Sequence, residues 1–220
     1  MRSARRTIGI TVKPEGVVVR VPRHASIAEV ERVVASRARW VAEAVAHARA
    51  CLPERRFSDG ADYVYRGRPR VLRLGRGCPG DAGAAVSLHD GDASLLVRVP
   101  GEPTPAAVSD ALGAWLLAEA RRELPDRLAA CWERFGRPDE TMPTLRVGLM
   151  RSRWGSLAAR SRMTLNAHLL RASDEAMDAV VYHELCHMRV DGHGADFYAE
   201  LAAYVPEWRR YRAELRGLVL

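Results

Sequence analysis

Three histidines and one glutamate lie close together near the C-terminal end of the sequence. His183, Glu184, His187 and His193 form the pattern HExxHxxxxxH. A helix turns by about 100° and rises by about 1.5 Å per residue, so His183 and His187 would lie about 40° and 6 Å apart. Two imidazoles at this spacing can bind one metal ion, each at about 2.1 Å. Glu184 lies about 60° to the side of His187, where its carboxylate can accept a proton from water at that metal.

His193 can join the other two histidines only if the chain leaves the helix first. In a straight helix it would lie about 9 Å beyond His187 and about 120° around the axis. Asp191 and Gly192 favour a turn at this point. Three neutral imidazoles leave a fourth coordination position open, as in catalytic zinc sites. The pattern therefore predicts Zn²⁺ bound by the three histidines, with Glu184 as the general base of a hydrolase.

The residues before the motif predict a helix from about 174 to 190. Ser173 can cap its N-terminus, and Asp174 and Glu175 place acids in its first turn. Apolar residues form one stripe along it, and the histidines lie on the adjoining stripe. This context favours a metal site over the alternative of three solvated or structural histidines.

Composition is typical of a globular protein that does not enter the membrane. The chain has 220 residues, of which 48% are hydrophobic and 28% charged. No apolar run approaches the length of a membrane span, and no signal-type segment opens the sequence, so a cytoplasmic location is expected. Four scattered cysteines predict neither a disulfide framework nor a thiolate zinc cluster.

The net charge of +7 would permit attraction to nucleic acid. Almost all of the positive charge is arginine, with Lys13 as the single lysine, and a GC-rich coding sequence explains this bias. No basic run carries interleaved aromatic residues. Charge alone therefore indicates at most a weak association with nucleic acid.

Periodicity and turn residues predict an α+β fold. The N-terminal part is expected to hold a β-hairpin at 7–22, a helical region from 26 to 45, and strands near 63–65, 70–74, 86–89 and 94–99. The C-terminal part is expected to hold a helix at 104–135, strands at 142–150 and 163–169 around a loop at 151–156, the motif helix, and helices at 195–204 and 207–217. Pro125 is expected to kink or divide the first of these helices. The sequence thus predicts a β-rich region over 1–103 and a zincin-like helix–strand–helix catalytic region over 104–220, together forming one compact unit.

Several short motifs resemble the YgjP-like metallopeptidase-domain family, a group of minimal zincins similar to SprT-like and WLM domains. The matching segments are Ser152–Ser156, Leu165–Asn166, Val180–His187 and His193–Phe197. The resemblance extends over most of the chain and implies a zinc peptidase, with the three histidines as ligands and Glu184 as the base. Val190 occupies the position of the turn-forming glycine of metzincins, which argues against that related clan.

Further residues are candidates for stabilising a developing negative charge. They are Arg153, Asn166, His168, Tyr198 and Tyr204, although residues of these types are more often structural or solvated. Trp154 is expected either to line the cleft or to lie in the core. The strand containing Leu165–Asn166 is expected to present its edge to an extended peptide.

The favoured function is a metallopeptidase acting on peptides or proteins. Because zinc hydroxide also attacks phosphorus and arginines are frequent at 151–162, a nucleotide pyrophosphohydrolase is an alternative. A zinc-stabilised module that binds DNA or a partner protein is a third possibility. No heptad pattern is present, so the sequence predicts no particular oligomeric state.

Overall fold

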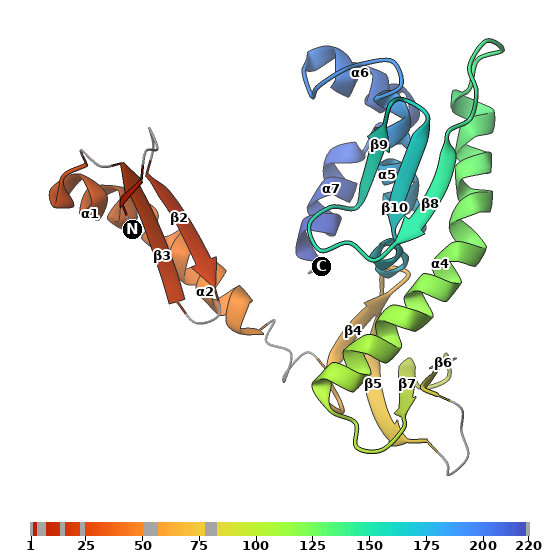
Figure 1. The fold of residues 1–220 in the computed structure, drawn as a ribbon, viewed down its shortest axis with the longest axis horizontal. Helices are drawn as coiled ribbons and strands as arrows, with labels where there is room; N and C mark the ends of the chain where they lie inside the picture. Colours follow the sequence, from red (N-terminus) through yellow and green to blue (C-terminus); the bar gives the residue numbers. More distant parts are fainter. Residues whose placement is uncertain are drawn as a thin grey trace. The chain divides into compact units, whose positions relative to one another are not determined.

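The computed structural model describes residues 2–3, 8–13, 16–22, 25–50, 57–77 and 83–218. The chain divides into two compact units, residues 1–56 and 57–220. Helices and strands are mixed in both units (Figure 1), which confirms the α+β class. The strands between 62 and 99 belong to the second unit, where they pack against the helix that follows them.

The first unit is a small sheet with two helices. Its elements are β1 (Arg2–Ser3), β2 (Gly9–Lys13), β3 (Gly16–Pro22), α1 (Ile27–Ser36) and α2 (Ala38–Ala50). Strands β2 and β3 are antiparallel, and β1 is parallel to β3. This pairing confirms the predicted hairpin, although its turn residues Pro14 and Glu15 lie outside the described residues. The Ser26 hydroxyl accepts the backbone N–H of Glu29 at 3.2 Å and caps α1, as the sequence predicts.

The second unit begins with a four-stranded sheet in the order β4-β5-β7-β6. Its strands are β4 (Asp62–Tyr65), β5 (Arg68–Arg76), β6 (Ala85–His89) and β7 (Ser94–Val99). Strands β5 and β7 are parallel, and the other pairs are antiparallel. Alternate residues Leu95, Val97 and Val99 of β7 are buried, so one face of the sheet packs against the next helix.

Helix α4 (Pro105–Phe135) runs beside both sheets of this unit (Figure 1). Thr104 caps its N-terminus. The helix continues through Pro125 without interruption, so the division allowed for from the sequence does not occur. A proline inside a helix costs about 3 kcal/mol. Leu124 and Leu128 are almost completely buried on either side of it, and burial of each contributes about 1.5–3 kcal/mol.

A second sheet has the order β8-β10-β9. Its strands are β8 (Thr144–Gly148), β9 (Gly155–Ala158) and β10 (Arg162–Asn166). Strand β8 is parallel to β10, and β9 is antiparallel to it. The prediction placed residues 155 and 156 in a loop, whereas they begin β9, and it extended the next strand to residue 169, whereas β10 ends at Asn166. Residues Ala167–Arg171 form a 3₁₀ helix, because the Asn166 side chain accepts the backbone N–H of His168 and starts a turn.

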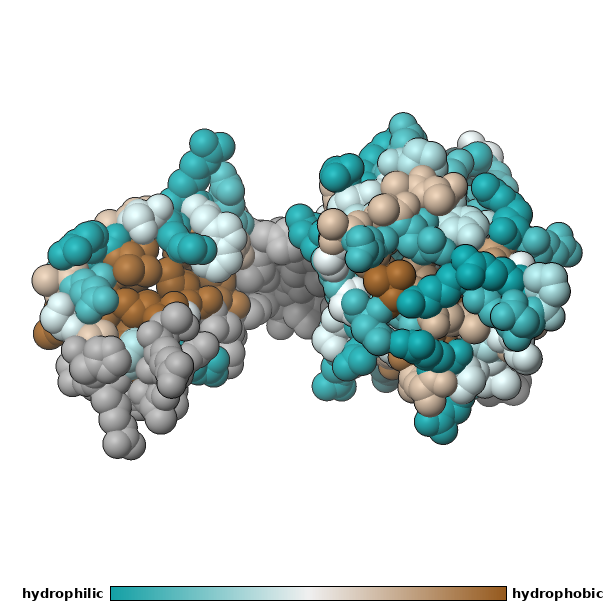
Figure 2. All heavy atoms as spheres, turned by 90° about the horizontal axis from the view of Figure 1, so that it is seen from above, coloured by the Kyte–Doolittle hydropathy of each residue, from teal (hydrophilic) through white to brown (hydrophobic). Residues whose placement is uncertain are grey.

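Three helices complete the second unit, namely α5 (Asp174–Cys186), α6 (Ala195–Tyr204) and α7 (Trp208–Gly217). Ser173 caps α5, and Asp174 and Glu175 lie in its first turn, as predicted. The predicted helices at 195–204 and 207–217 are confirmed as α6 and α7. In the described part of the chain, no helix is both long and apolar enough to span a bilayer. The visible face of the second unit is mostly hydrophilic, with small apolar patches (Figure 2).

Candidate metal centre

The three motif histidines meet where α5 ends and α6 begins. His183 lies in the last turn of α5, His187 follows its last residue, and His193 lies in the loop before α6. Their ligand nitrogens all lie within 4.8 Å of one another, and the Nε2 atoms of His183 and His193 are 3.1 Å apart. A tetrahedral metal with bonds of about 2.1 Å would separate two ligand nitrogens by about 3.4 Å. The three rings are therefore arranged closely enough to share one ion.

The loop that carries His193 starts earlier than the sequence indicates. Helix α5 ends at Cys186, whereas the sequence predicts a helix to about residue 190. The Val190 carbonyl faces the His187 ring, 3.3 Å from Nδ1. A carbonyl can only accept, so Nδ1 carries the proton and Nε2 is free to bind a metal. Gly192, with φ of +74°, then returns the chain towards the site.

Phe197 supports all three imidazoles from one side. Its ring centroid lies 4.8 Å from that of His183, 4.6 Å from His187 and 4.8 Å from His193, and the residue is completely buried. This contact limits the rotation of the three rings. Sequence reasoning gave Phe197 no role at the site. The available signal was its position four residues after His193, which places it on the first turn of α6.

The donor set suits a metal ion. Burial, followed by the neighbouring His187 and His193, lowers the pKa of His183 to about 4, and burial also lowers the pKa of His193. Both rings are therefore neutral at pH 7, which is the form of histidine that binds metal. Three imidazoles with no cysteine among them match the ligands of a catalytic zinc site.

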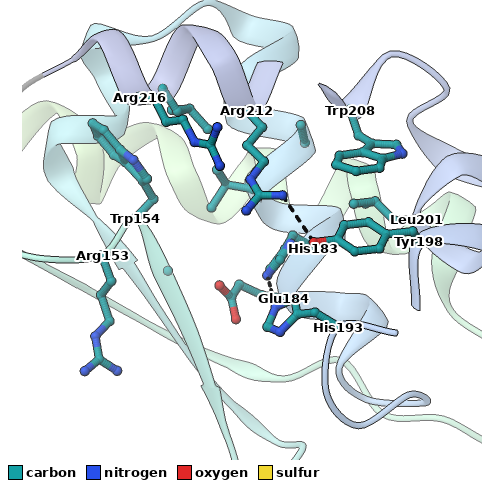
Figure 3. Close-up of a pocket in the computed structure, with 14 residues that line it drawn as sticks. Arg153, Trp154, His183, Glu184, His193, Tyr198, Leu201, Trp208, Arg212 and Arg216 are labelled. Atoms are coloured by element: carbon teal, nitrogen blue, oxygen red, sulfur yellow. Dashed lines mark hydrogen bonds between the residues drawn. The ribbon is translucent and has the colours of Figure 1, made fainter. Parts of the chain in front are cut away.

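Glu184 lies beside the histidines with its carboxylate facing β9 (Figure 3). Only 6% of the residue is exposed, and this burial raises its pKa to about 7. The Arg153 charge and a hydrogen bond from the Leu157 backbone N–H oppose the rise. The close approach depends on Gly155, because a Cβ there would lie 2.7 Å from Glu184 Oε1. A carboxylate with this pKa can take up and release a proton near neutral pH.

A comparison with known protein families identifies one that matches this chain. The family described as YgjP-like, metallopeptidase domain matches residues 6–217, nearly the whole sequence. The chain belongs to this family. The resemblance found in the sequence is thereby confirmed, and the chain is a metal-dependent peptidase.

Among solved structures, the metallopeptidase zymogen abylysin of Pyrococcus abyssi is similar to this YgjP-like chain. The two are 18% identical, the match covers 44% of this chain and 98% of that one, and the TM-score is 0.36. No curated protein matches the chain.

A cleft of about 590 Å³ opens beside the histidines of this YgjP-like domain (Figure 3). The site residues that line it are His183, Glu184 and His193; the remaining walls are Arg153, Trp154, Gly155, Ala179, Val180, Tyr198, Leu201, Trp208, Arg212, Leu215 and Arg216. Arg153, Trp154 and Tyr198 thus lie where the sequence placed them as candidates. Sequence reasoning missed Arg212 and Arg216. The only signal for them was a spacing of four residues on one predicted helix.

Asn166 is a structural residue. Its Nδ2 donates to the carbonyls of Met150 and Arg153, both at 2.9 Å, and its Oδ1 accepts the N–H groups of Met150 and His168. These bonds hold the loop that leads into β9, so the Asn166 amide has no capacity left for a substrate. His168 lies in the 3₁₀ helix and does not line the cleft.

Tyr204 also lies outside the cleft. Its hydroxyl accepts a hydrogen bond from Arg189 Nη1 at 3.1 Å, and its ring stacks on that of Tyr182 with centroids 5.2 Å apart.

The edge strand next to the site also differs from the expectation. Strand β10, which contains Leu165–Asn166, pairs on both sides, and the edge beside Glu184 belongs to β9.

Proposed function

We propose that the chain is a zinc-dependent peptidase in which His183, His187 and His193 bind the metal and Glu184 is the general base. One observation carries this proposal. Three imidazole nitrogens lie within 4.8 Å of one another, beside a buried carboxylate with a pKa of about 7. Ionisable groups with perturbed pKa values cluster at functional sites, and a pKa near the working pH suits a general base.

The bound zinc would supply a Lewis acid that polarises the scissile carbonyl and lowers the pKa of water to about 7. The protein supplies the proton transfer. Glu184 accepts a proton from the attacking water and donates it to the leaving amine, and a pKa near 7 suits both steps. Phe197 and the Val190 carbonyl orient the histidine rings.

Strand β9 is suited to hold an extended substrate. One side of Gly155–Ala158 pairs with β10, and β9 is the last strand of the sheet on its other side. A peptide added at this edge would form backbone hydrogen bonds and pass Gly155, which lies next to the Glu184 side chain. Its scissile bond would then lie next to the carboxylate.

A nucleotide pyrophosphohydrolase is the second candidate, and one observation favours it. Arg153, Arg212 and Arg216 all line the cleft, and guanidinium groups bind phosphate well. The peptidase is preferred because the family is one of metallopeptidase domains and because an edge strand lies beside the base.

The test combines zinc content with hydrolysis of unfolded protein and of nucleoside triphosphates. We expect one zinc per wild-type chain, loss of zinc in His187→Ala, and retention of zinc without turnover in Glu184→Gln. Glu175→Gln makes the same change at an exposed position of the same helix and should match wild type. If zinc-loaded wild type cleaves no peptide bond but releases pyrophosphate in a Glu184-dependent manner, the peptidase proposal is wrong.

A further inference from the structure

Three arginines line the cleft beside the metal centre without a part in the proposed reaction, and two of them, Arg212 and Arg216, come from one helix. Arg212 and Arg216 lie one helical turn apart on α7, and both line the cleft. Figure 3 shows Arg212 directed towards the space above His183, with its guanidinium 3.3 Å from the Tyr198 hydroxyl. Any group bound there would lie next to the proposed catalytic residues.

These two arginines have no acidic partner among the residues that the structure describes. Arg212 donates to the Tyr198 hydroxyl, and Arg216 forms no ion pair with any residue that the structure describes. By contrast, Arg210 on the same helix pairs with Glu207 at 3.2 Å. Among the described residues, Glu184 is the one acidic residue that lines the cleft, and it faces β9. The cleft therefore offers positive charge that is not neutralised from within.

The rest of the cleft is largely apolar. Trp208 stacks on Tyr198 with ring centroids 4.3 Å apart and an interplanar angle of 16°. Aliphatic side chains line the remaining wall, namely Ala179, Val180, Leu201 and Leu215. The volume of about 590 Å³ is in the range of small-ligand sites. A ligand with an apolar body and one anionic end matches this lining best.

We propose that this cleft selects peptides that carry a carboxylate within one residue of the scissile bond. The carboxylate is either the C-terminus of the peptide or an Asp or Glu side chain, and Arg212 and Arg216 bind it through charge-assisted hydrogen bonds. This inference rests on the proposed peptidase function. A polyphosphate fits less well, because its several negative charges would lie close to the Glu184 carboxylate.

The test uses the zinc-loaded full chain and matched peptide pairs. One pair has Glu or Gln next to the scissile bond, and the other has a free or amidated C-terminus. We expect the carboxylate member of at least one pair to be cleaved with a kcat/KM about 10- to 100-fold higher. Arg212→Gln combined with Arg216→Gln should remove this preference, so that both members of each pair are cleaved with a similar kcat/KM.

The matched control is Arg210→Gln, which removes one positive charge from the same helix outside the cleft and should keep the preference. Arg212→Lys retains the positive charge and should therefore keep part of the preference for carboxylate peptides. A second readout avoids turnover: in Glu184→Gln, carboxylate peptides should bind more tightly than neutral ones by calorimetry, and the two arginine changes should abolish the difference.

The outcomes separate this inference from the proposed function. Peptide cleavage without any carboxylate preference, or a preference that survives both arginine changes, overturns the inference and leaves the peptidase intact. If the chain binds carboxylate peptides in an arginine-dependent manner but cleaves none, the inference about the cleft is supported and the peptidase proposal is wrong. Arginine-dependent binding of nucleoside triphosphates, with no binding of carboxylate peptides, overturns the inference in favour of a nucleotide ligand.

Discussion

Replacement of Gly155 by alanine should displace Glu184 while leaving the three histidines in place. A Cβ at residue 155 would lie 2.7 Å from Glu184 Oε1 and 2.8 Å from its Cγ. Carbon atoms in contact are ordinarily about 3.5–4.0 Å apart, so the glutamate side chain would have to move by about 1 Å. Since Glu184 is buried and accepts the Leu157 backbone N–H, this movement breaks a hydrogen bond.

The expected magnitudes follow from this geometry. Overpacking of a buried site lowers the free energy of unfolding by about 1–3 kcal/mol. A displacement of about 1 Å at a catalytic group can lower kcat/KM about 100-fold. Zinc content should stay at the wild-type level, because the clash involves Glu184 and not the histidines.

The assays are urea unfolding followed by circular dichroism, zinc content, and peptide hydrolysis. Gly148→Ala is the matched control, because a Cβ there meets nothing within 4 Å. If Gly155→Ala and Gly148→Ala have the same free energy of unfolding and the same kcat/KM, the argument for a close approach between β9 and Glu184 is refuted.

Three other predictions concern the loop that holds the site and the metal. Arg189, which donates to Glu140, Glu200 and the Phe135 carbonyl, anchors the residues before His193; Arg189→Met should lower the free energy of unfolding by about 2–3 kcal/mol and weaken zinc binding, as measured by urea unfolding and zinc titration. Arg189 also lowers the pKa of Glu140, so the folded chain binds fewer protons there than the unfolded chain. Near neutral pH, the free energy of unfolding of wild type should therefore exceed that of Glu140→Gln. This difference, measured by urea unfolding, should decrease as the pH falls below about 4. Removal of zinc by a chelator should lower the Tm, and zinc added back at 100 times its Kd should raise the free energy of unfolding by about 2.7 kcal/mol. If the Tm does not change with zinc, the proposed site is wrong.

The helices and the clustering of His183 with His187 could be predicted because they depend on neighbours in the sequence. Helical periodicity, the caps at Ser26 and Ser173, and the spacing of four residues act within one or two turns. The α+β class and the family followed from the same local patterns.

Other features depend on which surfaces meet. Helix α5 ends at Cys186, and the backbone N–H groups of Arg189 and Val190 then donate to the Cys186 carbonyl in a turn. This turn brings the Val190 carbonyl to the His187 ring and orients it. Helix α4 continues through Pro125 because its neighbouring leucines are buried against the rest of the unit. Pairing of β10 on both sides, which leaves the edge to β9, involves strands separated along the chain.

The sequence alone determined which residues have metal-binding chemistry and that two of them share a helix face. Tertiary structure decided how deeply Glu184 is buried, that Gly155 allows its position, and that Arg212 and Arg216 face the same cleft. The physical reason is distance along the chain. Backbone geometry relates residues a few positions apart, whereas burial and electrostatic environment arise only when segments distant in sequence pack together.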